Sequence, residues 1–260
     1  SLPLITSSIL SKKIASGLQS LVLDVKVGNG SFNSTIEISR ELSHSLVSVA
    51  KGSGLQCEAI ITDMNQVLGK SAGHTLEILE CIKFIKNENK DPRLEKITYE
   101  LTASLLMMVC KISKDEALQK IKEVIANGLA AEKFEMMVKA LGGPANILSS
   151  YEKDLKINLV KNDFFIEKKG WIEKIETRQL GLILIELGGG RKQVTDKINF
   201  SVGYDNVVSI GDMADPAKPI LTLYSQTKED YESVRKKICD CFVISEKESK
   251  KLPEVYETIN

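Results

Sequence analysis

The sequence is poor in the side chains that bind transition metals or build disulfide frameworks. Its 260 residues contain only two histidines and five cysteines. His44 and His74 lack metal-ligand spacing, and Cys239-Asp240-Cys241 is not the Cys-x-x-Cys pair of a zinc site. An odd number of widely spread cysteines in a chain of this length indicates reduced thiols. The sequence therefore argues against a zinc protein and against a disulfide-stapled secreted fold.

The chain also lacks a net charge and long apolar runs. Lys plus Arg and Asp plus Glu are both 35, so no overall field attracts nucleic acid or an acidic membrane. No apolar stretch approaches the roughly 20 residues that span a bilayer, and no signal-peptide pattern is visible. The 43% of hydrophobic residues can build a substantial core. We expect a globular cytoplasmic protein with neither nucleic acid nor membrane as a partner.

The chain from about residue 16 to residue 155 alternates between short apolar runs and longer helical patterns. Strands are predicted at 21–27 and 58–62, and helices at 36–50, 75–86, 93–109, after the capping box Ser113–Glu116, and at 130–140. Alternating strands and helices are typical of parallel strands joined by crossover helices. The fold class predicted for this part is α/β, a parallel sheet with flanking helices.

The pattern changes over residues 156–260, where short strands and turn residues dominate. Strands are predicted at 159–161, 170–175, 198–200 and 220–225, with helices at 180–187 and from the capping box Thr227–Asp230 to about 242. Such short strands indicate an antiparallel α+β C-terminal subdomain. The tail 247–260 is expected to be mostly exposed.

The opening segment predicts a helix that carries two polar side chains on one face. Apolar residues recur at helical spacing over residues 9–18, and Gly17 stands where such a helix would stop. Ser8 and Lys12 fall one turn apart, and residues four apart project side by side. A hydroxyl and an ammonium could therefore reach one ligand, although an exposed amphipathic helix explains the same pattern.

Two polar residues, Asp24 and Lys26, interrupt the apolar strand 21–27, which ends in Gly28-Asn29-Gly30. The carboxyl ends of strands are where α/β sheets bind ligands, and glycine lets the backbone approach a bound group closely. Asp24 and Lys26 either line or support such a cleft or form a structural ion pair. The two glycines mark either a ligand loop or a tight turn.

Four separated blocks of the sequence carry a resemblance to a known family. They are SLPLITSSILSKK (1–13), LDVKVGNGSF (23–32), TDMNQVLGKSAGHTLE (62–77) and LGGGR (187–191) with FSVGY (200–204). In this order the blocks resemble the pyrimidine-nucleoside phosphorylase family, and among its members the bacterial thymidine phosphorylases. The TDMNQVLG run is closer to the thymidine-specific branch, and the alternative is a broad-specificity pyrimidine-nucleoside phosphorylase.

This resemblance implies an activity and a base site. The activity is reversible phosphorolysis of thymidine to thymine and 2-deoxy-α-D-ribose 1-phosphate in pyrimidine nucleoside salvage, by a cytoplasmic homodimer. Inorganic phosphate is the co-substrate and no organic cofactor is needed. The positions that match Ser8 and Lys12 bind the pyrimidine ring in the family, so these two residues are the substrate-binding candidates.

The resemblance also implies a structural potassium or calcium ion. Its ligands match the backbone carbonyls of Leu68 and Ser71 and the carboxylate of Glu80, and oxygen ligands suit hard cations. Without the resemblance, Glu80 is simply a polar position on a helix.

The glycines of LGGGR follow a helix, which fits a helix C-cap better than a phosphate cradle.

The resemblance reaches only the later, larger part of the family's chain. A small helical lobe, of which residues 1–15 would be the remnant, and a phosphate loop would precede Ser1. The predicted domains are therefore 1–15, 16–155 and 156–260. We therefore expect a fragment that contains half of the base site. We assign no catalytic residue within it, and we expect it to be inactive by itself. Two alternatives remain: a non-catalytic truncated subunit and an anthranilate-type phosphoribosyltransferase. A phosphoribosyltransferase needs acidic Mg²⁺ ligands, whereas Asp24-Val25-Lys26 offers only one carboxylate.

Overall fold

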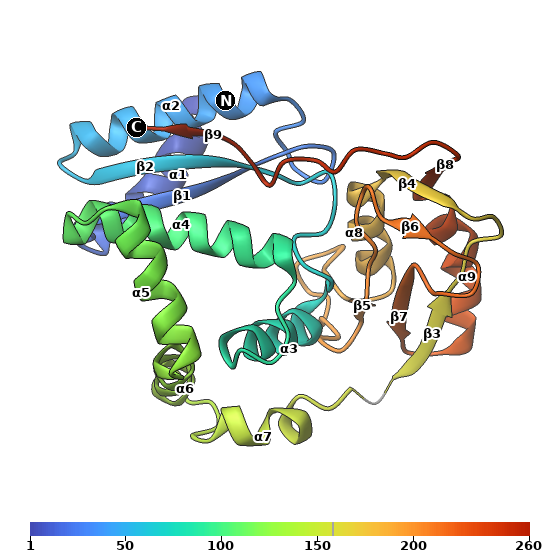
Figure 1. The fold of residues 1–260 in the computed structure, drawn as a ribbon. Coiled ribbons are helices and arrows are strands. Elements are labelled where there is room, and N and C mark those ends of the chain that lie inside the picture. Colours follow the sequence, from blue (N-terminus) through green and yellow to red (C-terminus); the bar gives the residue numbers. More distant parts are fainter. Residues whose placement is uncertain (158) are drawn as a thin grey trace. The chain divides into compact units, whose positions relative to one another are not determined.

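The computed structural model describes residues 1–157 and 159–260, which divide into two compact units (Figure 1). Unit 1 consists of residues 1–64, 92–123 and 253–260, and unit 2 of residues 65–91 and 124–252. The chain therefore leaves unit 1 after Met64 and returns to it twice. These boundaries do not coincide with the predicted ranges 1–15, 16–155 and 156–260.

Unit 1 contains a three-stranded sheet in the order β1-β2-β9. Strands β1 (Ser20–Val27) and β2 (Gln56–Asp63) are parallel, and β9 (Val255–Ile259) lies antiparallel to β2. The parallel pair is joined by a helix, as the sequence predicts. In Figure 1 the sheet lies between α2 (Ile36–Gly52) and α4 (Pro92–Cys110).

The first helix, α1 (Leu2–Ala15), packs against α2. Leu10 is 1% exposed and belongs to the core formed by α2 and by Val25 and Val27 of β1. The Thr6 hydroxyl lies 2.8 Å from the Ser45 hydroxyl of α2. This side of α1 is thus fixed by burial and by a hydrogen bond.

The tail 247–260 is exposed at most positions, as predicted, but it also contains a strand that the sequence analysis missed. Residues 255–259 alternate between inward and outward positions, and Ile259 is 5% exposed in the core of unit 1. Ile259 pairs with Ala59 and Thr258 with Ile60. The period of two was present in the sequence, but it spans only five residues beside a charged stretch, which hid it.

Unit 2 contains two antiparallel sheets, in the orders β3-β7-β5 and β6-β4-β8. The strands are β3 (Val160–Phe164), β4 (Gly170–Ile175), β5 (Gly203–Asp205), β6 (Met213–Ala214), β7 (Leu221–Ser225) and β8 (Phe242–Ser245). Helices α8 (Thr177–Glu186) and α9 (Lys228–Cys239) share their buried core. The predicted α/β fold with an antiparallel α+β C-terminal part is confirmed.

The remaining helices of unit 2 pack around one small core. They are α3 (His74–Ile85), α6 (Leu129–Ala140) and α7 (Ile147–Asp154); α5 (Lys114–Ala126) begins in unit 1 and ends in unit 2. Ile82 of α3 and Ile147 and Tyr151 of α7 are buried together. The sequence analysis missed α7, whose eight residues carry few apolar side chains. Among the described residues, no helix combines the length and apolarity needed to cross a bilayer.

Three predicted elements of the C-terminal part need correction. Residues 198–200, where a strand was expected, are irregular, because the Asn199 side chain accepts a hydrogen bond from the Ser201 N–H and favours a turn. The strand β5 lies further along the chain, at Gly203–Asp205. The helix expected to reach 242 ends at Cys239, and β8 follows it. The strand predicted at 159–161 begins at Val160 and continues to Phe164.

The glycines of LGGGR form a helix C-cap, as predicted. Gly188 has a φ of +89°, in the left-handed region that favours glycine. Its N–H donates to the Ile185 carbonyl, and the Gly189 N–H donates to the Leu184 carbonyl at 2.8 Å. These bonds satisfy the last carbonyls of α8, so this glycine run has a structural role.

A buried ion pair joins three segments of unit 1. The Asp63 side chain, at the end of β2, is fully buried, and its Oδ2 lies 2.9 Å from the Arg93 guanidinium in the first turn of α4. The same guanidinium nitrogen donates to the Asp63 carbonyl at 2.8 Å, and the Tyr256 hydroxyl of β9 lies 3.3 Å from Oδ1. Asp63 thus connects β2, α4 and β9.

We predict that Arg93→Met destabilises unit 1 by about 3 kcal/mol, because it leaves the Asp63 carboxylate buried without its cation. The control is Arg40→Met, which removes an exposed ion pair to Glu257, 2.5 Å long, and should cost less than about 1 kcal/mol. Urea unfolding measures both variants. A loss in Arg93→Met no larger than in Arg40→Met contradicts the prediction.

Candidate functional site

The predicted base-binding residues, Ser8 and Lys12, lie one turn apart on α1, and both are exposed. Thr6 and Leu10 hold the opposite side of the helix against α2. Each polar residue follows one of these anchors by two positions, which is about 200° around the helix. The side chains of Ser8 and Lys12 therefore point away from α2.

Lys12 also lies in the last turn of α1, where basic residues are favoured by the helix dipole. Its backbone carbonyl accepts hydrogen bonds from the N–H and the hydroxyl of Ser16, at 3.1 and 2.7 Å. The end of the helix is thus capped locally, and the first turn and the last turn carry no acidic residue that would neutralise Lys12. A hydroxyl donor and an ammonium donor suit the carbonyl oxygens of a pyrimidine.

Asp24 and Lys26 form an ion pair on β1. The Lys26 ammonium lies 2.7 Å from Asp24 Oδ2, and it donates to the Thr62 hydroxyl of β2 at 2.9 Å. The Thr62 hydroxyl in turn donates to Asp24 Oδ1, which closes a three-residue network. The side chains of Lys26 and Asp24 are 23% and 25% exposed. The sequence left open whether Asp24 and Lys26 line a cleft or form a structural ion pair. The structure shows the ion pair, and both side chains are partly exposed.

The Gly28-Asn29-Gly30 segment is a tight turn at the end of β1. Gly28 has a φ of +127° and its N–H donates to the Asn33 carbonyl. The Gly30 N–H donates to the Met64 carbonyl at 2.9 Å, which fixes the turn to the residue that follows β2. The turn therefore brings the carboxyl ends of β1 and β2 together, the edge where such sheets bind ligands.

The structure does not bring all predicted residues of unit 1 to one place. Val25 and Val27 face the core beneath α1 and α2, so Asp24 and Lys26, which alternate with them, project from the other face of the sheet. Asp24 lies beside Leu101 and Leu105 of α4 there. The pair on α1 and the pair on β1 are therefore separated by the sheet.

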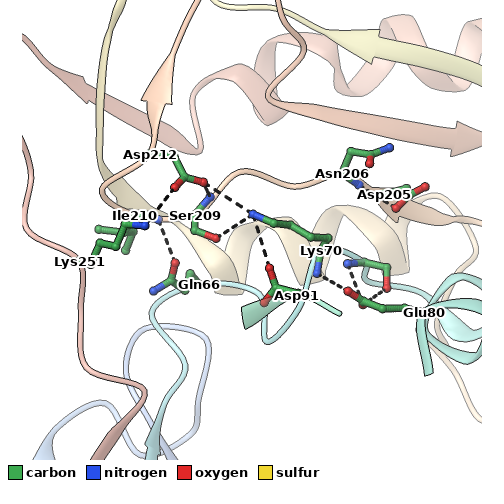
Figure 2. Close-up of polar contacts among 11 residues, drawn as sticks. Gln66, Lys70, Glu80, Asp91, Asp205, Asn206, Ser209, Ile210, Asp212 and Lys251 are labelled. Carbon is green, nitrogen blue, oxygen red and sulfur yellow. Dashed lines mark hydrogen bonds and ion pairs between the residues drawn. The ribbon is translucent and has the colours of Figure 1, made fainter. Parts of the chain in front are cut away.

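The predicted cation ligands lie in unit 2, where Ser71 and Glu80 are in contact (Figure 2). Glu80, on α3, accepts hydrogen bonds from the Lys70 N–H at 2.7 Å, from the Ser71 N–H at 3.2 Å and from the Ser71 hydroxyl. A Cβ added to Gly69 would lie 2.7 Å from Glu80 Oε2. A side chain at residue 69 would therefore displace the Glu80 carboxylate from its present position.

The donor set of this loop suits a hard cation. A carboxylate offers about four lone-pair sites, and Glu80 uses three for these hydrogen bonds. Within the described residues, no hydrogen bond reaches the carbonyl oxygens of Leu68 and Ser71. Carboxylate and carbonyl oxygens are what potassium or calcium prefers, so Leu68, Ser71 and Glu80 fit the group that the resemblance implies.

The sequence analysis missed the partners that support these residues. Thr62 closes the Asp24–Lys26 pair, Arg93 neutralises Asp63, and Asp212 faces Lys70, at 3.6 Å between Oδ2 and the ammonium. Each contact joins residues 30 or more positions apart, which no local pattern reveals. The only available signal was a polar residue at the end of a buried strand, at Thr62 and Asp63.

Cysteine and histidine take no part in these sites. Burial raises the pKa of the Cys57 and Cys241 thiols to about 11, so both stay protonated and unreactive near neutral pH. His74 is exposed at the start of α3 and packs edge-on against Phe200, at 5.1 Å between ring centroids. Over the residues that the structure describes, no cluster of His, Cys, Asp and Glu has metal-binding geometry.

Two family models match the chain. Residues 1–131, half of the chain, match the a/b domain of the glycosyl transferase family. Residues 171–245, inside unit 2, match the pyrimidine nucleoside phosphorylase C-terminal domain. The first match includes α1 and both parallel strands, and the second includes β4, α8, α9 and β8. The chain therefore belongs to the pyrimidine nucleoside phosphorylase family of the glycosyl transferases and is of the pentosyltransferase type.

Proposed function

We propose that this protein is a thymidine phosphorylase, which converts thymidine and phosphate reversibly to thymine and 2-deoxy-α-D-ribose 1-phosphate. The observation that carries the proposal is the exposed Ser8–Lys12 pair on α1, within a block that resembles the pyrimidine-nucleoside phosphorylase family. The choice of thymidine rests on the separate TDMNQVLG run (62–69), which is closer to the thymidine-specific branch. Phosphate as co-substrate, a homodimer and a cytoplasmic location belong to the same proposal and rest on the resemblance.

The proposed role of the pair follows from the charge that the reaction creates. Cleavage of the bond between N1 and C1′ leaves positive charge on the sugar and negative charge on the departing pyrimidine. Donors placed at the polar edge of the base bind that negative charge more strongly than they bind the neutral substrate, and they therefore lower the barrier. In this proposal Lys12 supplies the positive charge and Ser8 supplies a hydroxyl donor that orients the ring.

Asp24 and Lys26 act in this proposal as support for the carboxyl ends of β1 and β2. Their network with Thr62 links both strands, and the turn that follows is fixed to Met64. The Lys26 carbonyl also accepts the Ser31 hydroxyl at 2.8 Å and the Asn33 side-chain amide at 3.2 Å. A contact from this pair to substrate remains a prediction, because a quarter of each side chain is exposed.

We further propose that Glu80, with the carbonyl oxygens of Leu68 and Ser71, holds a potassium or calcium ion. When bound, such an ion supplies positive charge that ties this loop to further oxygen ligands, and its role is structural. The protein's own part is to keep the Glu80 carboxylate against the backbone of Lys70 and Ser71.

The base-site prediction is tested by phosphorolysis. In the whole protein, Lys12→Met should lower kcat/KM for thymidine about 100-fold or more, and Ser8→Ala should lower it less, because one loses a charge and the other a neutral donor. The control is Lys13→Met, which removes the neighbouring exposed cation of the same helix and should change little. Thymine release is measured with and without phosphate, for thymidine and for uridine.

Three results decide this prediction. Phosphate-dependent release of thymine that Lys12→Met abolishes and Lys13→Met preserves supports both the reaction and the site. Equal kcat/KM in Lys12→Met and Lys13→Met contradicts the role given to Lys12. A higher kcat/KM for uridine than for thymidine contradicts the thymidine-specific assignment and favours the broad-specificity enzyme.

The cation prediction is tested by melting. Replacing choline chloride with potassium chloride of equal strength should raise the Tm of the protein by several degrees, because a ligand that binds only the folded state stabilises it. Glu80→Gln should lose most of this rise, since it removes the ligand charge. Glu77→Gln, on the same helix, is the control; its carboxylate is exposed and accepts the Gly73 N–H at 2.9 Å. A full rise in Glu80→Gln, for calcium as well as potassium, contradicts the assignment.

A further inference from the structure

Lys70 connects the loop that carries the proposed cation ligands to residues 203–212 of unit 2 (Figure 2). Its backbone N–H donates to Glu80 Oε1 at 2.7 Å, and its carbonyl accepts the Val207 N–H at 3.0 Å. One residue thus hydrogen-bonds to α3 on one side and to the segment after β5 on the other. Any shift of this residue moves the neighbouring carbonyls of Leu68 and Ser71.

The side chain of Lys70 lies among acidic and hydroxyl groups. Its ammonium lies 3.2 Å from the Ser209 hydroxyl, 3.6 Å from Asp212 Oδ2 and 3.9 Å from Asp91 Oδ2. Asp91 has only 6% of its side chain exposed, so its charge is weakly screened by solvent. Asp212 is itself held, because its Oδ2 accepts the Ser209 N–H at 2.8 Å.

The backbone around Lys70 already fits closely against the same segment. Ala72 and Tyr204 exchange two hydrogen bonds, at 3.0 and 2.7 Å. A Cβ added to Gly73 would lie 2.6 Å from the Val202 carbonyl oxygen, so the two backbones are in direct contact there. Lys70 adds a charge attraction to this contact at the end of the loop nearest to Glu80.

We propose that Lys70 is a positioning residue, which fastens the loop of Leu68 and Ser71 to Ser209 and Asp212 of the C-terminal domain. The same ammonium also holds the loop to Asp91, at the end of the segment 65–91. The cation part of this inference rests on the proposed function. The C-terminal domain thereby takes part in the cation site without supplying a ligand.

Amide hydrogen exchange tests directly whether Lys70 positions the loop of Leu68 and Ser71, and the test does not require a bound cation. Lys70→Met should speed the exchange of the Ser71 and Ala72 amides about tenfold, because local opening of the loop becomes easier. Lys70→Arg keeps the charge and should restore rates near those of the wild-type chain. The control, Lys251→Met, removes an exposed cation 3.9 Å from Asp212 Oδ1 and should leave these amides unchanged.

Unchanged exchange of Ser71 and Ala72 in Lys70→Met, or equal acceleration in Lys70→Met and Lys70→Arg, overturns the inference. The potassium-dependent rise in Tm separates it from the proposed function. A wild-type protein without that rise refutes the cation site, while the exchange rates still decide the role of Lys70. Where the wild-type protein shows the rise, Lys70→Met should lose at least half of it, and a full rise in that variant overturns the link to the cation.

Discussion

The Asp63 carboxylate is the group on which the arrangement of unit 1 depends. It is fully buried, and a carboxylate that leaves water at such a place needs a cation and hydrogen bonds to offset its lost hydration. Arg93 and Tyr256 supply both, from α4 and from β9. The chain must therefore return from unit 2 twice to complete the end of β2, once at residue 92 and once at residue 253. The same strand end carries Thr62 and fixes the turn after β1 through Met64.

In unit 2, too, a carboxylate accepts several hydrogen bonds, here from the loop that contains Lys70 and Ser71. Glu80 is satisfied by two backbone N–H groups and a hydroxyl, and a side chain at residue 69 would displace its carboxylate. The partners differ in their distance along the chain: Asp63 is held by residues 30 and 193 positions away, and Glu80 by residues nine and ten positions away. The block 62–77 therefore contains the buried acid Asp63, Gly69 beside the Glu80 carboxylate, and the loop whose backbone Glu80 holds.

The sequence predicted the elements whose pattern is local. The segment from β1 to β2 agrees with prediction to within two residues at each end, because its strands are short apolar runs and the apolar residues of α2 recur at helical spacing. The strand β9 and the helix α7 were missed because their short patterns lie among charged residues. The side chains of Ser8 and Lys12 could be placed together from spacing alone. The Thr62, Arg93 and Asp212 contacts could not be predicted, because they arise only when distant strands and loops are assembled.

The central claim is that the face of α1 opposite Thr6 and Leu10 binds a pyrimidine, and a crystal structure of the protein soaked with thymine tests it most directly. The account predicts thymine with polar atoms about 2.7–3.2 Å from the Ser8 hydroxyl and the Lys12 ammonium. Thymine bound elsewhere, with these two side chains in contact with solvent alone, would contradict it.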